Sequence, residues 1–360
     1  MARVLFENVT KEFGSVKAVN DVSLEIQDGE LLCLLGPSGC GKTTTLRLIA
    51  GLETATSGRI HIGDTDVTRF SPKDRDVGMV FQDYALYPHM NLADNIAYPL
   101  KVRKVREAAR MERAKEVADH LRIGHLMERL PGQISGGQQQ RTSVARAVVH
   151  EPRVFLFDEP LSNLDAKLRL ESRGFIKHLQ QEMGVTAVYV THDQAEAMAL
   201  ADRIAVMQDG VIVQIGSPLE IYRNPQTSFV ANFLGSPPMN LFDAEVRNGS
   251  FVGTSFELNA KRVKEHSALN DGDSVTLGIR PEHVRVSPKP MKNSIASELY
   301  AFEALGPESI LSFRIDEQLL VARAFGDDPP EIEMGQTAYL SFEPRHLHLF
   351  DEHGSRVNAD

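Results

Sequence analysis

The chain has 360 residues, of which 42% are hydrophobic and 24% charged, proportions typical of a globular protein long enough for two domains. Its net charge of −10 argues against a dedicated nucleic-acid-binding protein, which would carry a basic surface. The two cysteines, Cys33 and Cys40, fit neither a disulfide framework nor a Cys-x-x-Cys metal motif, so we expect a reducing compartment. We find no signal-peptide pattern and no apolar run of about 20 residues, so other chains would have to supply any membrane-spanning part.

The N-terminal part of the chain predicts short strands that lead into an apolar strand. Residues 3–9 and 22–26 look like strands, and Asp28-Gly29 before the apolar run 31–35 is a hairpin-type turn signal. Phe13 falls in the loop between the first two strands. It is either a small core aromatic or a flat surface on which a purine base could stack.

Residues 36–43 read G-P-S-G-C-G-K-T and fit the phosphate-loop pattern, with a helix predicted over 44–50. Backbone N–H groups and the positive end of the helix dipole would face phosphates, with Lys42 on the outer phosphates and the Thr43 hydroxyl on Mg²⁺. Because Cys40 lies at a helix N-terminus, we expect a favoured thiolate whose modification blocks nucleotide binding. The loop residues predicted to contact the nucleotide are Gly36, Pro37, Ser38, Gly39, Cys40, Gly41, Lys42, Thr43 and Thr44.

A polar residue ends the next apolar strand, and a helical segment follows it. Residues 77–82 end in Gln82, whose neutral oxygen could ligate Mg²⁺ or position a water, although a lone Gln after a strand usually has no such role. Residues 92–130 are rich in Ala, Arg, Glu and Leu, with apolar residues at helical spacing, including Ala109. We predict a helical insertion in which the basic run 101–106 forms a solvated helix face, with a partner contact as the alternative.

The run Ser135-Gly136-Gly137-Gln138 predicts the start of a capped helix. Ser135 would be the N-cap and Gln138, three residues on, would complete a capping box. The helix should end before Pro152. Two glycines in the first turn cost about 1 kcal/mol each relative to alanine. They are better explained if backbone amides must approach an anion.

Two further strands end in polar residues that could form a catalytic edge. Residues 154–158 are an apolar strand whose last residue, Asp158, would point at the carboxyl edge of a parallel sheet and suit Mg²⁺. Glu159 would then orient or deprotonate a water. The strand 186–190 leads to His192, a candidate phosphate-proximal donor at the same edge. Asp193 with Glu196 predicts an N-cap box for the following helix, and Asp209-Gly210 predicts a hairpin within 203–215.

The composition changes near residue 236, where Ser236-Pro237-Pro238 forms a stiff connector. Residues 240–350 lack helical periodicity and predict a small all-β barrel or a pair of barrels. The expected strands include L-F-D-A-E-V, F-V-G-T-S-F, S-V-T-L-G-I, I-L-S-F-R-I and A-Y-L-S-F. For residues 280–283, R-P-E-H, we favour a structural corner over a metal or acid–base site.

With these residues in view, the sequence resembles the ATP-binding subunits of ABC transporters, and more closely the maltose, trehalose and glycerol-3-phosphate importer group. The phosphate loop, the acidic motif ending at 158–159 and the signature at 134–138, I-S-G-G-Q where L-S-G-G-Q is usual, carry the resemblance. Residues 162–165 match the D-loop, and residues 235–240 with 280–283 look like the linker and barrel motifs of the importer group. Ile134 for Leu is a volume-conserving change. Other matches are Gln82 in the Q-loop, His192 in the H-loop and Phe13 at the aromatic that stacks on adenine, where Tyr or Trp is common.

The resemblance implies an α/β phosphate-loop nucleotide-binding domain over 1–235, with antiparallel β and helical subdomains, the latter at about 88–150. An all-β, OB-like domain for regulation and dimerisation would occupy 236–360. Two copies would enclose two ATP molecules, each held by one phosphate loop and the other copy's signature. The implied catalytic residues are Glu159 as general base, His192 and Lys42, and the implied Mg²⁺ ligands are Thr43, Gln82 and Asp158. Implied nucleotide contacts beyond the phosphate loop are Phe13, Gln82, Ser135, Gly136, Gly137, Gln138 and Asp165.

The implied function is ATP hydrolysis, with Mg²⁺, that drives a carbohydrate importer from the cytoplasmic face of a bacterial or archaeal inner membrane. The expected partners are a second copy, two membrane-spanning permease subunits and, indirectly, an extracytoplasmic solute-binding protein, with no nucleic acid. Three alternatives remain open. They are an importer motor for a polyamine or metal chelate, a soluble ABC ATPase of repair or translation, and a regulatory module that binds ATP without hydrolysing it.

Overall fold

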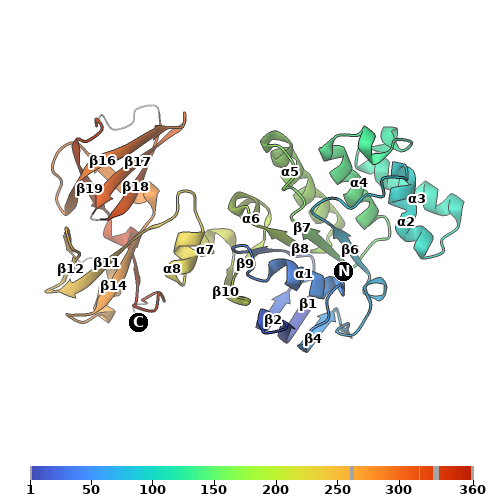
Figure 1. The fold of residues 1–360 in the computed structure, drawn as a ribbon, viewed down its shortest axis with the longest axis horizontal. Coiled ribbons are helices and arrows are strands. Elements are labelled where there is room, and N and C mark those ends of the chain that lie inside the picture. The colour runs from blue at the N-terminus through green and yellow to red at the C-terminus, as the bar shows by residue number, and fades with distance from the viewer. Residues whose placement is uncertain (1, 260–262, 316, 327–331, 358–360) are drawn as a thin grey trace. The chain divides into compact units, whose positions relative to one another are not determined.

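A computed structural model of the chain describes residues 2–259, 263–315, 317–326 and 332–357. The chain divides into two compact units, Met1–Leu219 and Glu220–Asp360, and we describe each by itself (Figure 1). Among the described residues, every helix is too short or too polar to cross a membrane.

The first unit is built around a six-stranded sheet of order β10-β9-β3-β8-β7-β6. Its neighbouring strands are parallel except β9 and β10, which form the hairpin predicted at Asp209-Gly210. The central strands β3, β7 and β8 are buried along their whole length, as expected for parallel strands covered on both faces. The strands are β3 Leu31–Leu35, β6 Val77–Val80, β7 Val154–Asp158, β8 Thr186–Thr191, β9 Arg203–Gln208 and β10 Val211–Gly216.

A four-stranded antiparallel sheet of order β2-β1-β4-β5 accompanies it. Its strands are β1 Val4–Phe13, β2 Val16–Ile26, β4 Ser57–Ile62 and β5 Thr65–Asp66. β1 and β2 are longer than predicted, because register shifts in their pairing interrupt the apolar alternation. Phe13 is therefore paired with Val16 at the end of β1, not in a loop.

The hairpin predicted at Asp28-Gly29 is wrong, because this turn joins β2 to β3, and the two strands belong to different sheets. The N–H of Gly29 donates to the hydroxyl of Thr186, at 3.0 Å. This contact directs the chain to the side of β8, with which β3 then pairs. A turn signal alone does not specify which sheet the next strand joins.

Helix α1, Lys42–Ala50, begins at the phosphate loop. Its apolar face belongs to a core that also includes residues of β1, β2, β7 and β8, so the helix packs against both sheets. Buried Arg75 closes its C-terminal end, because the guanidinium donates to the carbonyls of Leu48, at 2.5 Å, and Ile49, at 3.0 Å. Two further carbonyls, of Thr68 and Phe70, accept from the same guanidinium. The helix is thus anchored at the end opposite the loop.

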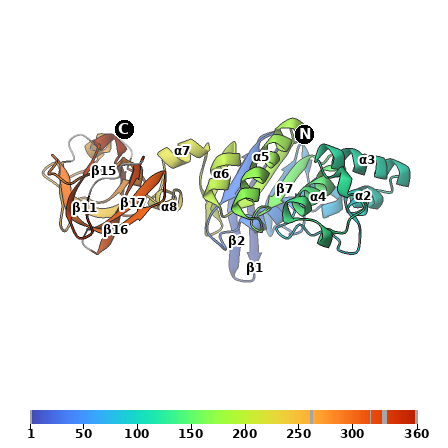
Figure 2. The ribbon, with the colours of Figure 1, turned by 90° about the horizontal axis from the view of Figure 1, so that it is seen from above.

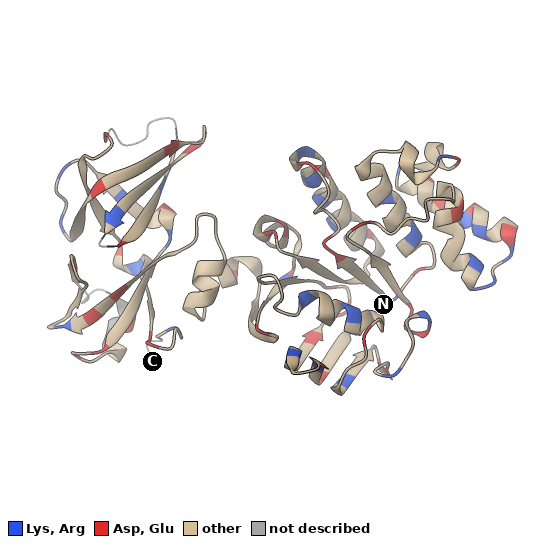
Figure 3. Cartoon of the chain, in the orientation of Figure 1, with Lys and Arg blue, Asp and Glu red and all other residues tan. Residues whose placement is uncertain are grey.

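The predicted insertion is helical and consists of α2 Leu92–Val102, α3 Glu107–His120 and the following α4 Gly136–Val148. These helices gather beyond β6, away from β9 and β10 (Figures 1 and 2). Basic and acidic residues are interspersed over them (Figure 3). The basic run 101–106 lies mostly in the turn between α2 and α3 and is largely exposed, so it is solvated but is not a helix face. Ala109, expected on the apolar side of α3, is exposed.

The remaining helices follow the strands that carry the acidic and histidine motifs. They are α5 Ala166–Met183 after β7 and α6 Gln194–Leu200 after β8, then α7 Pro218–Arg223 and α8 Ser228–Phe233. Short 3₁₀ turns occur at Pro72–Asp74, Gly124–Leu126, Pro131–Gln133, Lys264–Ala268, Pro281–His283 and Pro344–His346.

The second unit contains two five-stranded antiparallel sheets, β13-β12-β11-β14-β20 and β15-β19-β16-β17-β18, which enclose one apolar core. The predicted run 251–256 is not one strand, because the N–H of Gly253 donates to the carbonyl of Phe256 and closes a turn. The first sheet consists of β11 Asn240–Arg247, β12 Ser250–Val252, β13 Glu257–Asn259, β14 Ser274–Ile279 and β20 His348–Phe350. The second consists of β15 Val284–Ser287, β16 Ser294–Ala304, β17 Glu308–Ile315, β18 Gln318–Phe325 and β19 Thr337–Phe342.

Arg280 explains why residues 220–235 belong to this second unit. The side chain is 2% exposed, and its guanidinium donates to the carbonyls of Tyr222, Ala231 and Leu234. The Tyr222 hydroxyl in turn donates to Glu282, at 2.6 Å. A buried guanidinium would be costly without these partners. The R-P-E-H motif is therefore a packing corner that holds the α7–α8 segment.

Candidate functional site

The carboxyl ends of β3, β7 and β8 meet at one edge of the parallel sheet. In the strand register, Leu35 at the end of β3 lies opposite Thr191 at the end of β8. Asp158 at the end of β7 lies opposite Val190. The segments that follow these strands, which carry the phosphate loop, the acidic pair and His192, therefore emerge side by side. This edge is where ligands bind in open α/β sheets.

The shape of the phosphate loop requires its glycines. A Cβ on Gly36 would lie 2.3 Å from the carbonyl oxygen of Met207, and one on Gly41 would lie 2.2 Å from that of Ala18. Gly41 also has φ +106° and is the N-cap of α1, a conformation that residues with a side chain rarely adopt. In the described structure no side chain caps this helix end, which leaves its backbone N–H groups for an anion.

Lys42 is 6% exposed and folds back over the phosphate loop. Its ammonium group donates to the carbonyls of Gly36, at 2.7 Å, and Pro37, at 2.9 Å. These contacts hold a buried positive charge against the loop, where it would attract phosphate oxygens.

The expectation of a favoured Cys40 thiolate is wrong. Cys40 is buried, and burial raises the pKa of its thiol above the ordinary value, which outweighs the lowering by nearby Lys42. Its Sγ lies 3.8 Å from the Lys42 ammonium and within 2.6 Å of a Cβ on Gly36. Cys40 is thus a packing residue of the loop.

The Thr43 hydroxyl donates to the carboxylate of Asp158, at 3.3 Å. Burial raises the pKa of Asp158, and Arg47 and this hydrogen bond partly offset the rise. A hydroxyl and a carboxylate are the hard oxygen ligands that suit Mg²⁺. Among the described residues, no three His, Cys, Asp or Glu side chains gather as a metal site. A cation held by this pair would take its other ligands from phosphates and water.

Glu159 and His192 form the most distinctive contact at this edge. The Glu159 carboxylate lies 2.9 Å from Nδ1 of His192. Glu159 has φ +46°, a left-handed conformation that is uncommon for a residue with a side chain and is often found at functional sites. Its N–H donates to the carbonyl of Val190, at 3.0 Å, and the Ser162 hydroxyl donates to its carbonyl.

The start of α4 has the predicted capping box. The N–H of Ser135 donates to the Gln138 side chain, at 2.9 Å, and the N–H of Gln138 donates to the Ser135 hydroxyl, at 3.4 Å. A Cβ on Gly137 would meet only a side-chain carbon of Leu168, at 3.7 Å, and one on Gly136 would meet a side-chain carbon of Leu164, at 3.3 Å. Neither glycine has positive φ, so the fold of this chain does not itself require them.

The structure brings together Lys42, Thr43, Asp158, Glu159 and His192. The remaining phosphate-loop residues, 36–41 and 44, belong to the same edge because they follow β3 directly. The predicted site residues outside the loop lie elsewhere: among the described contacts, none joins the start of α4 to the phosphate loop. Gln82 is exposed beyond edge strand β6, with its carbonyl held by Asn163. Phe13 is 47% exposed, and the centroid of its ring lies 4.6 Å from the Lys11 ammonium nitrogen. Asp165 caps α5 by accepting from the N–H of Leu168.

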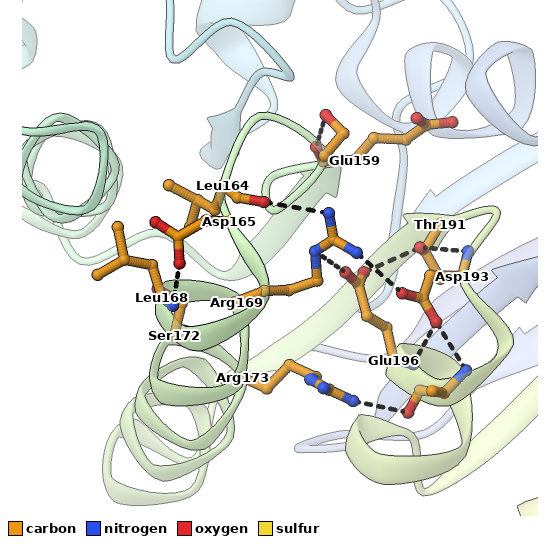
Figure 4. A network of polar contacts seen from close by, with 12 residues as sticks. Glu159, Leu164, Asp165, Leu168, Arg169, Ser172, Arg173, Thr191, Asp193 and Glu196 are labelled. Atoms are coloured by element: carbon orange, nitrogen blue, oxygen red, sulfur yellow. Dashed lines mark hydrogen bonds and ion pairs between the residues drawn. The ribbon is translucent and has the colours of Figure 1, made fainter. Parts of the chain in front are cut away.

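Sequence reasoning missed Arg169, which lies beside the D-loop and the His192 segment (Figure 4). The signal available was its place in the first turn of α5, where a positive charge opposes the helix dipole. The capping box predicted for α6 is only half present. Asp193 caps the helix, but Glu196 turns away to accept from Tyr189 and Thr191.

Comparison with known families places three matches along the chain. Residues 19–162 match the ABC transporter family, residues 235–284 the MalK OB fold domain, and residues 277–350 the TOBE domain. These matches confirm the predicted phosphate-loop domain followed by an OB-like β domain.

Full-length relatives agree with these matches. The chain is 46% identical, over 99% of its length and 95% of the relative, to the sn-glycerol-3-phosphate import ATP-binding protein UgpC of Psychromonas ingrahamii. It is 47% identical to the trehalose/maltose import ATP-binding protein MalK of Thermococcus litoralis, over 98% of each chain. It is 44% identical to the sulfoquinovosyl glycerol transport ATP-binding protein SmoE of Agrobacterium fabrum, again over 98% of each.

Solved structures resemble the nucleotide-binding part. The dimeric post-hydrolysis state of the ATP-binding cassette MJ0796, bound to ADP and Pi, has a TM-score of 0.54 and 32% identity, and covers 60% of this chain and 98% of that one. Together with the site geometry, these likenesses identify the chain as a member of the ABC transporter family, among the ATP-hydrolysing ATP-binding subunits of importers that carry a MalK-type OB fold and a TOBE domain.

Proposed function

We propose that this chain is the motor of an importer for a sugar, sugar alcohol or glycerol phosphate. It would work as a homodimer on the cytoplasmic face of the membrane, bound to two permease subunits. The first unit would bind and hydrolyse ATP, and the second unit would extend the dimer contact and receive regulatory signals. The relatives named above, which import glycerol-3-phosphate and trehalose or maltose or transport sulfoquinovosyl glycerol, support this solute class.

The contact between Glu159 and His192, 2.9 Å apart, is the observation that carries the catalytic part of the proposal. Glu159 would accept a proton from the attacking water while the water oxygen bonds to the γ-phosphorus and the bond to the bridging oxygen of ADP breaks. His192 would hold the carboxylate in place and donate to the γ-phosphate. Lys42 and the loop amides would stabilise the charge that develops on the phosphate oxygens.

Mg²⁺ would be held by Thr43 and Asp158, and by Gln82 once the dimer closes, and would neutralise phosphate charge. The 3.3 Å contact between Thr43 and Asp158 supports this assignment. The two side chains come from different elements, α1 and β7, which lie at the same sheet edge.

The glycines at the start of α4 support the dimer. Because the fold of this chain tolerates a methyl group at Gly137, a different demand must explain the glycine. A γ-phosphate bound by the other copy would need to approach the backbone closely at this point, which would explain the glycine. The Ser135 hydroxyl and the α4 N–H groups would donate to that phosphate. Phe13, at an exposed hairpin tip, would stack on the adenine, and Gln138 and Asp165 would help to shape the interface.

The decisive test of the catalytic assignment is Glu159→Gln, which keeps the shape of the side chain but removes the base. We expect turnover to fall by about 10²- to 10⁴-fold, with ATP binding retained and an ATP-bound dimer that persists on size-exclusion chromatography. Glu171→Gln, at an exposed carboxylate of α5, is the control and should behave as wild type. Near-normal turnover of the Glu159 variant would remove it as the base.

The importer assignment is tested by purifying the tagged chain from detergent-solubilised membranes of its host. We expect one or two polytopic membrane proteins to co-purify. The associated binding protein can then be screened against sugars, sugar alcohols and glycerol phosphates. Recovery of soluble partners alone, at every nucleotide state, would favour a soluble ABC ATPase. If the binding protein instead bound a polyamine or a metal chelate, that compound would replace sugars and glycerol phosphates as the proposed solute.

A further inference from the structure

Arg169 links two segments that flank the catalytic edge (Figure 4). From the first turn of α5, its guanidinium donates to the carbonyl of Leu164, at 3.1 Å. Leu164 lies within residues 162–165, which we call the D-loop. The same guanidinium lies 3.6 Å from the Asp193 carboxylate and 3.9 Å from that of Glu196, which follow β8.

The position of Arg169 is unfavourable for α5 alone. A positive charge near a helix N-terminus opposes the helix dipole. Its Nε atom is buried and has no hydrogen-bond partner in the described structure, because the distance to Glu196 is too long for one. The guanidinium is thus held by the two carboxylates and one carbonyl, and not by its own helix.

Hydrogen bonds around Glu196 and Asp193, which face Arg169, fix the backbone on both sides of His192. Glu196 is 3% exposed and accepts from the hydroxyls of Tyr189, at 3.0 Å, and Thr191, at 2.9 Å. The Thr191 hydroxyl also accepts from the N–H of Asp193, at 2.9 Å. The residues immediately before and after His192 are therefore fixed to one another and to Glu196.

The D-loop is connected in the same way to Glu159. The hydroxyl of Ser162 donates to the Glu159 carbonyl, at 3.0 Å, and the chain from Glu159 to Leu164 has no intervening helix or strand. Arg169 thus contacts one segment that begins at Glu159 and another that contains His192. These two side chains form the 2.9 Å contact described above.

We propose that Arg169 is a positioning residue for ATP hydrolysis, which sets the D-loop against residues 191–193 and so maintains the Glu159–His192 contact. The inference rests on the catalytic roles proposed for those two residues. Arg169 touches neither the phosphate loop nor Asp158 among the described contacts, so its removal should leave ATP binding intact. Only a guanidinium can reach the Leu164 carbonyl and both carboxylates at once, because its donors diverge from a rigid plane.

The test compares Arg169→Ala and Arg169→Lys with Arg173→Ala in the full chain. Arg173 lies one turn further along α5 and donates to the Ala195 carbonyl, at 3.3 Å. Among the contacts of the described residues, none joins Arg173 to the D-loop or to residues 191–193. We expect Arg169→Ala to lower kcat by roughly 10- to 100-fold with KM for ATP changed by less than about two-fold. The kcat of Arg169→Lys should lie between those of the wild type and Arg169→Ala, since lysine keeps the positive charge but lacks the diverging N–H donors of a guanidinium.

Two further measurements separate positioning from simple damage to the fold. Guanidinium ion added at millimolar concentration should restore part of the kcat of Arg169→Ala and none of that of Glu159→Gln. Equal kcat for the Arg169→Ala and Arg173→Ala variants, with Glu159→Gln inactive, would overturn this inference and leave the proposed function standing. Near-normal turnover of Glu159→Gln would overturn the proposed function itself. A loss of ATP binding in both Arg169 variants would show a structural role and also overturn the inference.

Discussion

Glycines lie at the N-termini of two helices of the first unit, just before α1 and in the first turn of α4, and the reasons for these glycines differ. At the start of α1, a methyl group on Gly36 or Gly41 would collide with backbone oxygens of the same chain. At the start of α4, a methyl group on Gly137 would make ordinary contact with one side chain. The phosphate loop is therefore complete within one chain. The contacts within the chain do not explain the α4 glycines, which in our proposal serve a ligand bound by a second copy.

The same contrast appears in the hydrogen bonds of the two helix starts. Among the described residues no side chain caps the α1 N-terminus, and Lys42 folds over the loop instead. The α4 N-terminus is capped by Ser135 and Gln138, so the helix is satisfied without a ligand. A nucleotide would therefore bind first to the α1 site, and the α4 start would join when a second copy arrives.

The largest effect should follow from Gly41→Ala. The new methyl group would lie 2.2 Å from the Ala18 carbonyl at a residue with φ +106°, so we expect a loss of about 2–4 kcal/mol in the free energy of unfolding. ATP binding should be lost as well. Chemical denaturation and nucleotide titration measure both. Gly39→Ala is the control, because Gly39 has φ +82° but open space around it; equal losses in the two variants would mean that strain, not collision, explains the glycine.

Gly137→Ala should have the opposite pattern. Alanine is a better helix former than glycine by up to about 1 kcal/mol, so stability should be unchanged or slightly higher. ATP binding to the single chain should also be retained. Turnover should fall by roughly 10- to 100-fold, because the methyl group would keep a phosphate from the backbone N–H groups. Wild-type turnover in this variant would refute the view that the α4 glycines serve a ligand.

The smallest effect on stability should follow from Asp158→Asn, beside the phosphate loop at the start of α1. Burial raises the folded-state pKa of Asp158 above 3.8, so its contribution to stability is full below that pH and is lost as pH rises through the folded pKa. Asp158→Asn should therefore stabilise the nucleotide-free chain at neutral pH, while Mg²⁺-dependent turnover disappears. Thermal melting across pH tests this expectation. The gain should shrink as the pH falls, and a gain that stays constant with pH would contradict it.

The catalytic edge was predictable because each part has a local signature. The phosphate loop, the apolar strand ending at Asp158, and the capped start of α4 depend on residues within one short stretch. The phosphate loop meets the segments that follow Asp158 and Thr191 because the buried strands β3, β7 and β8 pair in parallel, which the apolar runs indicate. The Glu159–His192 contact could be anticipated only as proximity, since the left-handed conformation of Glu159 has no signal in its sequence.

The features that could not be predicted from the sequence depend on contacts between segments that are distant along the chain. Burial raises the pKa of the Cys40 thiol and outweighs the lowering by Lys42, whereas the position of Cys40 at a helix N-terminus suggests a lowered pKa. Glu196 satisfies the capping-box pattern in the sequence. In the fold its carboxylate instead accepts hydrogen bonds from the buried hydroxyls of Tyr189 and Thr191. In the second unit the predicted strands did not include β13, β15, β16, β18 or β20, although the all-β fold type was correctly predicted from strand spacing.

The anchoring of α1 by Arg75 has a consequence for the response of this protein to ionic strength. Each hydrogen bond of that buried guanidinium in the described structure goes to a carbonyl. Its charge, like that of Lys42, is therefore sheltered from dissolved ions, which screen exposed charges far more than buried ones. Although the chain carries a net charge of −10, it retains two sheltered cations at the ends of one helix. Its attraction for phosphate should thus persist at salt concentrations that abolish binding to surface lysines.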